Sequence, residues 1–162
     1  VVGIPNVGKS TFINSFAGKA CTKTGNKPGV TKGKQWIRLN KELELLDTPG
    51  ILWPKFESEE VGKKLAFIGS MNDEILQMTE LAMELADYLM NYYRSVMTER
   101  YQLEQGREYE PVQLLEHICE TRKCYKKGQE PDYEKAASLL IDDFRSGRIG
   151  RITLELPDGE EG

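Results

Sequence analysis

Residues 3–10 read Gly3-Ile4-Pro5-Asn6-Val7-Gly8-Lys9-Ser10 and fit the pattern G-x-x-x-x-G-K-[ST]. This pattern is typical of the P-loop, a glycine-rich turn whose backbone N–H groups surround phosphate oxygens at the start of a helix. The lysine of such a loop reaches the terminal phosphates, and the final hydroxyl binds Mg²⁺. Val1-Val2 before the motif predicts a strand, and residues 11–16 after it predict a helix that ends near Gly18. This context favours a phosphate site over a chance match.

Residues 19–34 form a polar segment with the glycine and proline content of a loop. Apolar and polar residues then alternate over residues 35–39 and again over residues 42–46, on either side of Asn40-Lys41. This pattern predicts a β-hairpin. The second strand leads directly into Asp47-Thr48-Pro49-Gly50.

Asp47 and Gly50 form a D-x-x-G motif at the end of the expected strand. In P-loop NTPases this aspartate holds Mg²⁺, directly or through water, and the glycine N–H approaches the γ-phosphate. Thr31, in Pro28-Gly29-Val30-Thr31, lies where a loop threonine can bind the metal and the γ-phosphate and release them after hydrolysis. Taken alone, Thr31 is an ordinary loop residue and Asp47–Gly50 a strand-ending turn. The order of the three motifs along the chain favours one shared site.

The sequence therefore predicts a single nucleotide site. We expect Lys9, Thr31 and Gly50 to act on the phosphates during catalysis, and Ser10, Thr31 and Asp47 to hold Mg²⁺. The expected nucleotide contacts are Asn6, Val7, Gly8, Lys9, Ser10, Thr11, Thr31, Asp47 and Gly50.

The motifs of residues 1–60 resemble those of the translation-factor-like GTPases, which implies guanine as the base. The guanine-reading motif of that family, [NT]-K-x-D, does not occur after Gly50, and Asn40-Lys41-Glu42-Leu43 lacks the aspartate. Two explanations stay open: a degenerate nucleotide site, or a circularly permuted GTPase whose guanine-reading half precedes the P-loop. A chain that begins without Met, in an expected strand, is consistent with the second explanation.

Beyond Phe56 the pattern becomes helical. We expect a helix over residues 57–65 carrying the second switch, a long helix from a capping Ser70 to Val96, a helix after Pro111, and a helix from Pro131 to Gly147. The apolar face of the long helix consists of Ile75, Met78, Ala82, Leu85, Leu89, Tyr92 and Val96. The predicted fold is an α/β P-loop NTPase part-domain with an incomplete sheet over residues 1–65, followed by an all-α helical-bundle domain over residues 66–162.

The whole chain resembles the C-terminal portion of the ribosome biogenesis GTPase A family, circularly permuted GTPases of the YlqF type. The stretches that carry the resemblance are residues 3–10, Pro28–Thr31, Leu46–Ile51 and Gly150–Ile152. The resemblance implies GTP or GDP and Mg²⁺ as ligands, GTP hydrolysis as the activity, and the large ribosomal subunit, with its rRNA and ribosomal proteins, as the partner. DNA is not an expected partner. A membrane is not expected either, because no apolar run approaches the roughly 20 residues of a membrane span.

Two residues near the site bear on mechanism. Ile51 stands where many GTPases carry a glutamine that orients the attacking water. An apolar side chain cannot do this, so we expect slow intrinsic hydrolysis and, by the resemblance, activation by the ribosomal particle. Asn6 resembles the residue with which K⁺-activated members hold a monovalent cation, although a turn-forming asparagine is the alternative. Other activities stay open: a P-loop ATPase, or a non-catalytic RNA- or protein-binding module.

Charge is unevenly distributed. Residues 1–41 contain eight of the 22 basic residues and no Asp or Glu, which leaves 14 basic residues against 26 acidic ones, a net −12, in the remainder. The basic segment suits a polyanion or is a solvated lysine-rich loop. In the helical half, basic residues gather near expected helix ends, where they could contact RNA phosphates or complement helix dipoles. These residues are Arg122, Lys123, Lys126, Lys127, Arg145, Arg148 and Arg151.

Three cysteines, Cys21, Cys119 and Cys124, make an odd count without a disulfide framework, which fits a reducing cytoplasm. His117 lies near two of them. The group lacks a C-x-x-C spacing and a fourth ligand, so we interpret it as part of a helix face rather than a metal site.

Overall fold

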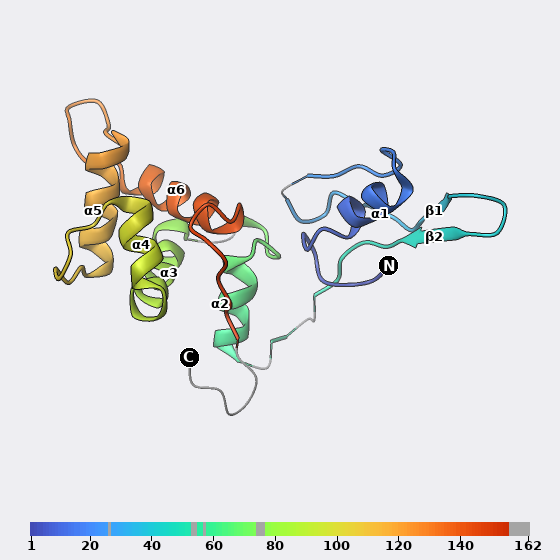
Figure 1. Cartoon of the computed structure of the whole chain (residues 1–162), viewed down its shortest axis with the longest axis horizontal. Coiled ribbons are helices and arrows are strands. Elements are labelled where there is room, and N and C mark those ends of the chain that lie inside the picture. Colours follow the sequence, from blue (N-terminus) through green and yellow to red (C-terminus); the bar gives the residue numbers. More distant parts are fainter. Residues whose placement is uncertain (26, 53–54, 57, 74–76, 156–162) are drawn as a thin grey trace. The chain divides into compact units, whose positions relative to one another are not determined.

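The computed structural model describes residues 1–25, 27–52, 55–56, 58–73 and 77–155 (Figure 1). The chain divides into two compact units, Val1–Ile75 and Leu76–Gly162. This division falls later in the chain than the predicted boundary between residues 65 and 66. The functional assignment of the two parts stays a prediction.

The first unit contains helices α1 (Lys9–Ala17) and α2 (Glu59–Phe67) and strands β1 (Gln35–Arg38) and β2 (Glu44–Asp47). The strands pair antiparallel, with Gln35 opposite Asp47 and Arg38 opposite Glu44, which confirms the predicted hairpin. Its turn is stabilised by the side chain of Asn40, whose Oδ1 accepts the N–H groups of Glu42 and Leu43 at 2.8 Å.

Val1-Val2 does not form a strand, so that prediction is wrong. The Val1 nitrogen donates to the Leu46 carbonyl at 2.8 Å, and the Val1 carbonyl accepts the Thr48 hydroxyl at 2.8 Å. Residue 1 therefore lies beside the end of β2. The P-loop motif begins at Gly3, and residues 1–3 form no ladder with β2.

Helix α2 is present where the sequence predicts a helix over residues 57–65, but it begins at Glu59 and ends at Phe67. Ser58 is its cap: the Ser58 Oγ accepts the Val61 N–H at 3.3 Å. Its last turn buries Leu65, Ala66 and Phe67. The expected helix start at Ser70 is wrong. Ser70 is 1% exposed, and its hydroxyl donates to the Pro5 carbonyl at 2.7 Å instead of capping a helix.

The second unit consists of helices α3 (Met78–Tyr92), α4 (Arg94–Tyr101), α5 (Pro111–Arg122) and α6 (Tyr133–Arg145). Helix α3 contacts the other three, and α5 also contacts α6. The fully buried side chains at these contacts include Leu85, Leu89, Met97, Leu114, Ile118, Leu140 and Ile141. The helices predicted after Pro111 and Pro131 are confirmed, and Leu114, Leu115, Ile118 and Cys119 face inward as expected.

The predicted single helix from Ser70 to Val96 is instead broken at Tyr93, where φ is −134° and ψ is 33°. Val96 and the fully buried Met97 belong to α4. The Tyr93 hydroxyl lies 3.0 Å from both the carbonyl oxygen and the nitrogen of Thr153. This long-range contact accompanies the break, while the apolar periodicity continues across it. Ile75, which also belonged to the predicted apolar face, lies outside the described residues.

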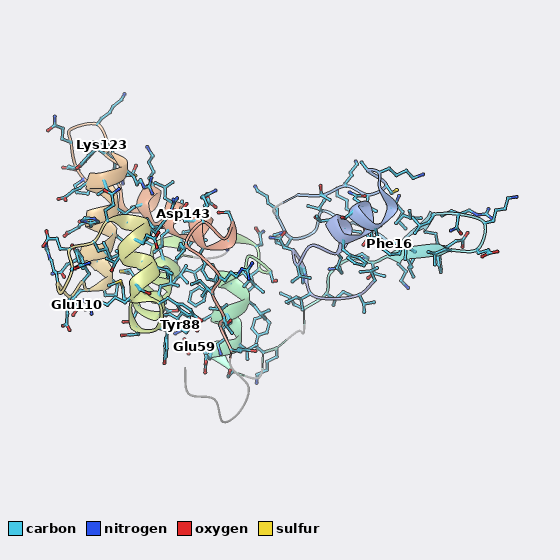
Figure 2. All side chains as sticks on the ribbon, viewed as in Figure 1. Phe16, Glu59, Tyr88, Glu110, Lys123 and Asp143 are labelled. Carbon is cyan, nitrogen blue, oxygen red and sulfur yellow. The ribbon has the colours of Figure 1, made fainter. Side chains whose placement is uncertain are left out.

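Asp143 is a buried charge in the second unit, labelled on α6 in Figure 2. Its Oδ2 accepts from Arg100 Nε at 2.9 Å and from the Tyr101 hydroxyl at 3.1 Å, and its Oδ1 accepts from Arg148 Nε at 2.6 Å. Burial raises the pKa of Asp143, but hydrogen bonds from Arg148 and Arg100 outweigh it and hold this pKa below its usual value. Among the described residues, none of the helices is long and apolar enough to cross a membrane.

Candidate phosphate and metal site

The P-loop turns tightly into α1. Asn6 and Gly8 have φ values of 58° and 86°, and Gly8 is the residue that precedes the helix. The left-handed conformation at position 8 is one that glycine adopts without steric cost. The Lys9 Nζ lies over the loop and donates to the carbonyls of Gly3 at 3.1 Å and Ile4 at 2.7 Å. The ammonium group is thus held at the mouth of the turn by neutral acceptors.

Ser10, Thr31 and Asp47 come together from α1, the following loop and the end of β2. The Ser10 hydroxyl donates to Asp47 Oδ2 at 2.9 Å and lies 3.1 Å from the Thr31 hydroxyl. The Thr31 hydroxyl is 3.5 Å from the same carboxylate oxygen. The three residues predicted to hold the metal are therefore neighbours in space.

Asp47 is fully buried, and its Oδ1 has no hydrogen-bond partner among the described residues. An unpaired buried carboxylate oxygen is costly unless a ligand satisfies it. Two hydroxyl oxygens and one carboxylate form an oxygen-only set, the donor type that Mg²⁺ and Ca²⁺ prefer. The residues at this position thus fit a hard divalent cation.

Gly50 lies directly against the P-loop. A Cβ atom at this position would lie 2.4 Å from Pro5 Cα, 2.5 Å from Pro5 N and 2.8 Å from the Ile4 carbonyl carbon. Backbone atoms cannot move aside cheaply, so only glycine fits. The glycine of the D-x-x-G motif is required here by a close approach of two backbones.

A cavity of about 270 Å³ lies between the P-loop and the loop that follows α1. It is lined by Pro5, Asn6, Gly8, Lys9, Ser10, Thr11, Lys23, Thr24, Gly25, Lys27, Gly29, Val30, Thr31 and Gly50. Most of the predicted nucleotide contacts belong to this lining. Asp47 lies behind it, bonded to Ser10, and Val7 is half exposed and outside the lining. Thr11 lines the cavity with an exposed side chain.

The P-loop makes two hydrogen bonds that the sequence analysis did not predict. The Asn6 Nδ2 donates to the Gly69 carbonyl at 3.2 Å, and Ser70 bonds the Pro5 carbonyl. Both partners come from the turn after α2. Ser70 carries the local signature of a helix cap, so no signal in the sequence pointed to this role.

Asn14 on α1 is a second residue that the sequence analysis missed. Its Oδ1 accepts the N–H groups of Cys21 and Thr22 at 2.8 Å, and its Nδ2 donates to the Thr22 carbonyl at 2.9 Å. Asparagine is unfavourable within a helix unless its side chain bonds nearby backbone. An asparagine within a predicted helix was therefore the one sequence feature that could have indicated this contact.

The other candidate groups have different environments. Cys119 and Cys124 are buried, and the His117 Nε2 lies 2.9 Å from the Tyr101 carbonyl oxygen. The described residues contain no cluster of three or more metal-ligating His, Cys, Asp or Glu side chains. Arg148, one of the basic residues considered for RNA contact, is bonded to Asp143.

Comparison with known proteins agrees with this geometry. The family model described as "50S ribosome-binding GTPase" matches residues 1–117. Ribosome biogenesis GTPase A of Priestia megaterium is 47% identical over 99% of this chain and 56% of its own length, and that of Bacillus cereus is 45% identical over 98% and 53%. The chain thus spans about half the length of these relatives.

Solved structures give the same result. A GDP-bound YlqF structure is 29% identical with a TM-score of 0.63, covering 97% of this chain and 59% of that one. GNP-bound YlqF from T. maritima is 30% identical with a TM-score of 0.60, covering 97% and 58%. The P-loop, the hydroxyl–carboxylate cluster and the family match lead to one conclusion: the chain belongs to the 50S ribosome-binding GTPase family.

Proposed function

We propose that this chain carries the phosphate- and Mg²⁺-binding part of a GTP-hydrolysing assembly factor for the large ribosomal subunit. The observation that carries the proposal is the convergence of Ser10 and Thr31 on Asp47, whose buried Oδ1 lacks a partner within the described residues. An oxygen cluster of this kind beside a P-loop suits a nucleotide with its metal.

The residues of the cavity have distinct roles in this proposal. The P-loop backbone and the start of α1 hold the phosphates, and Lys9 leaves its carbonyl partners to neutralise their charge. Ser10, Thr31 and Asp47 hold Mg²⁺, which when bound neutralises charge on the β- and γ-phosphates. Gly50, pressed against Pro5, brings its backbone N–H toward the γ-phosphate.

Base recognition has no candidate in this chain, because [NT]-K-x-D is missing from the sequence after Gly50. The relatives are about twice as long as the matched region. We infer that guanine is read by a half of the protein that precedes the P-loop, in circularly permuted order. An upstream N-K-x-D motif within an α/β pattern would support this order, and its absence there would refute it.

The rate of hydrolysis depends on the residue after D-x-x-G. Ile51 is 77% exposed and apolar, so it cannot position water. Hydrolysis by the protein alone is then slow, and the ribosomal particle supplies the missing group. Asn6 lines the cavity, and its Nδ2 donates to the Gly69 carbonyl. Its Oδ1 is therefore the atom that would bind a K⁺ ion.

The partner follows from relatives that are named for ribosome biogenesis. Exposed basic residues of the second unit, such as Lys123 at the end of α5 (Figure 2), suit contact with rRNA phosphates. The free cysteines suit the cytoplasm, where such a particle would be bound.

A direct test is titration of fluorescent GTP, GDP and ATP into residues 1–162, with Mg²⁺ and with EDTA. We expect weak, Mg²⁺-dependent binding without preference between guanine and adenine, because the base has no pocket here. Submicromolar guanine-selective binding would contradict the permuted arrangement. Absence of any Mg²⁺-dependent binding would contradict the phosphate site itself.

A further inference from the structure

The loop after α1 is attached to Ser10 at both of its ends. At the near end, the Thr22 hydroxyl lies 3.1 Å from the Ser10 carbonyl oxygen and from Asn14 Oδ1. At the far end, the Thr31 hydroxyl lies 3.1 Å from the Ser10 hydroxyl. Residues 23–25 and 27–30 therefore lie between two anchors on the first turn of α1.

Two lysines of this closed loop line the phosphate cavity. Lys23 and Lys27 belong to its lining together with Lys9, whereas Lys19 and Lys34 of the same basic segment do not. Lys23 and Lys27 are exposed, and residues 1–41 contain no Asp or Glu. Asp47 lies behind the lining, where its carboxylate is bonded to Ser10. The cavity is thus lined by three lysines.

The negative charge of the expected ligand can be compared with the positive charge at the cavity. A nucleoside triphosphate carries more negative charge than Lys9 and one Mg²⁺ neutralise, and the excess lies on its terminal phosphates. Three lysines at one small cavity suit an anion bound between them. The alternative considered from the sequence is a solvated lysine-rich loop. That alternative does not explain why Lys23 and Lys27 line the cavity while the other lysines of the segment do not.

We propose that Lys23 and Lys27 form a cationic clamp on the terminal phosphates of the bound triphosphate. The proposal rests on the proposed function and adds two binding residues beyond Lys9. The loop that carries both lysines ends at Thr31, whose hydroxyl lies 3.1 Å from the Ser10 hydroxyl at the expected metal position. The clamp therefore favours a triphosphate over a diphosphate.

The probe that isolates this effect is inorganic tripolyphosphate with Mg²⁺, compared with pyrophosphate, because neither depends on a base pocket. Calorimetric titration is carried out on residues 1–162 and on a Lys23→Gln/Lys27→Gln variant. The matched control is Lys19→Gln/Lys34→Gln, which removes the same charge from the same segment but away from the cavity. All four positions are exposed, and thermal melts verify that each variant is folded.

We expect the clamp variant to bind tripolyphosphate about tenfold more weakly, as the loss of charge-assisted bonds predicts. Its affinity for pyrophosphate should fall less, and the control should match the unmodified chain. The difference between clamp variant and control should also shrink at about 0.5 M NaCl. These results together would support the clamp.

Equal tripolyphosphate affinities of the clamp variant and the control would overturn the clamp and leave the proposed function intact. An equal loss for both phosphates would also overturn it, because the lysines would then act only through general charge. Failure of the unmodified chain to bind tripolyphosphate with Mg²⁺ would overturn the phosphate site and the clamp together.

Discussion

The hydroxyl of Ser10 lies 2.9 Å from Oδ2 of Asp47, although 37 positions separate the two residues in the chain. This bond joins the first turn of α1 to the end of β2. Both side chains belong to the set expected to hold Mg²⁺, so a bound cation would compete with a bond that the protein makes to itself.

Replacing Asp47 by Asn should abolish the effect of Mg²⁺ while leaving the fold in place. A neutral amide costs less to bury than a carboxylate and can still accept the Ser10 hydroxyl. Loss of the charged ligand should weaken Mg²⁺-dependent GTP binding by about 10- to 100-fold. Titrations with Mg²⁺ and with EDTA measure this difference. The exposed Glu44→Gln on the same strand is the control, and retained Mg²⁺ dependence in Asp47→Asn would refute the metal site.

Replacing Gly50 by Ala should destabilise the first unit. The new methyl group would lie 2.4 Å from Pro5 Cα, and overpacking of this kind costs about 1–3 kcal/mol. Urea unfolding followed by tryptophan fluorescence reports this unit, because both tryptophans of the sequence fall within residues 1–75. Gly33→Ala is the matched control: its Cβ meets no atom within 4 Å, so it should change stability by less than about 1 kcal/mol. Equal stability of the two variants would contradict the close contact.

Replacing Asp143 by Asn should destabilise the second unit by about 2 kcal/mol at pH 7, because Arg100 and Arg148 lose their buried acceptor. The pKa of Asp143 is lowered by folding, so its stabilisation is present above the unfolded pKa and is lost as pH falls through the folded pKa. The variant and the unmodified chain should therefore begin to converge near the unfolded pKa of about 4 and become equal only below the lower, folded pKa. Thermal melts followed by helical circular dichroism at several pH values measure this, with the exposed Asp142→Asn as control.

Replacing Lys126 and Lys127 by Gln should weaken binding to large-subunit particles without a loss of stability. Both side chains are exposed on a short hairpin closed by the bridge between Tyr125 and Pro131, where they are available to phosphates. Loss of two phosphate contacts should reduce the slope of log affinity against log salt by about 2. Sedimentation binding assays at several salt concentrations measure the slope. An unchanged slope, equal to that of the exposed Lys135→Gln, would exclude this hairpin from the interface.

The hairpin of β1 and β2, the end of α1, the start of α5 and, to within two residues, both ends of α6 could be predicted from sequence, because glycine, proline and capping residues fix them locally. Ser10, Thr31 and Asp47 could be predicted as one site because its chemistry demands these residue types in this order. Tyr93 and Ser70 show where such reasoning fails. Apolar periodicity continues through the break at Tyr93, and Ser70 has the signature of a cap but bonds Pro5 from a distant part of the chain.

Lys23 and Lys27 mark a different limit. In the sequence they belong to a basic segment with several lysines, and nothing local separates them from Lys19 or Lys34. Their position at the cavity depends on where the loop is attached to α1. The attachments are the bonds of Thr22 to the Asn14 side chain and to the Ser10 carbonyl, which join side chains to backbone elsewhere in the chain. Residue type alone could not predict this path.

Asn14 gives the site an entropic advantage. The connection between α1 and β1 runs over residues 18–34, and the bonds from Asn14 to Cys21 and Thr22 fix its first part. Only residues 23–30, about half of the connection, then lie between the two anchors at Ser10. Since each halving of a flexible loop lowers its closure cost by about 0.6 kcal/mol, the ligand has less disorder to overcome when it closes the cavity. Asn14 is not part of the cavity lining, yet through this loop it would contribute to the affinity for a ligand bound there.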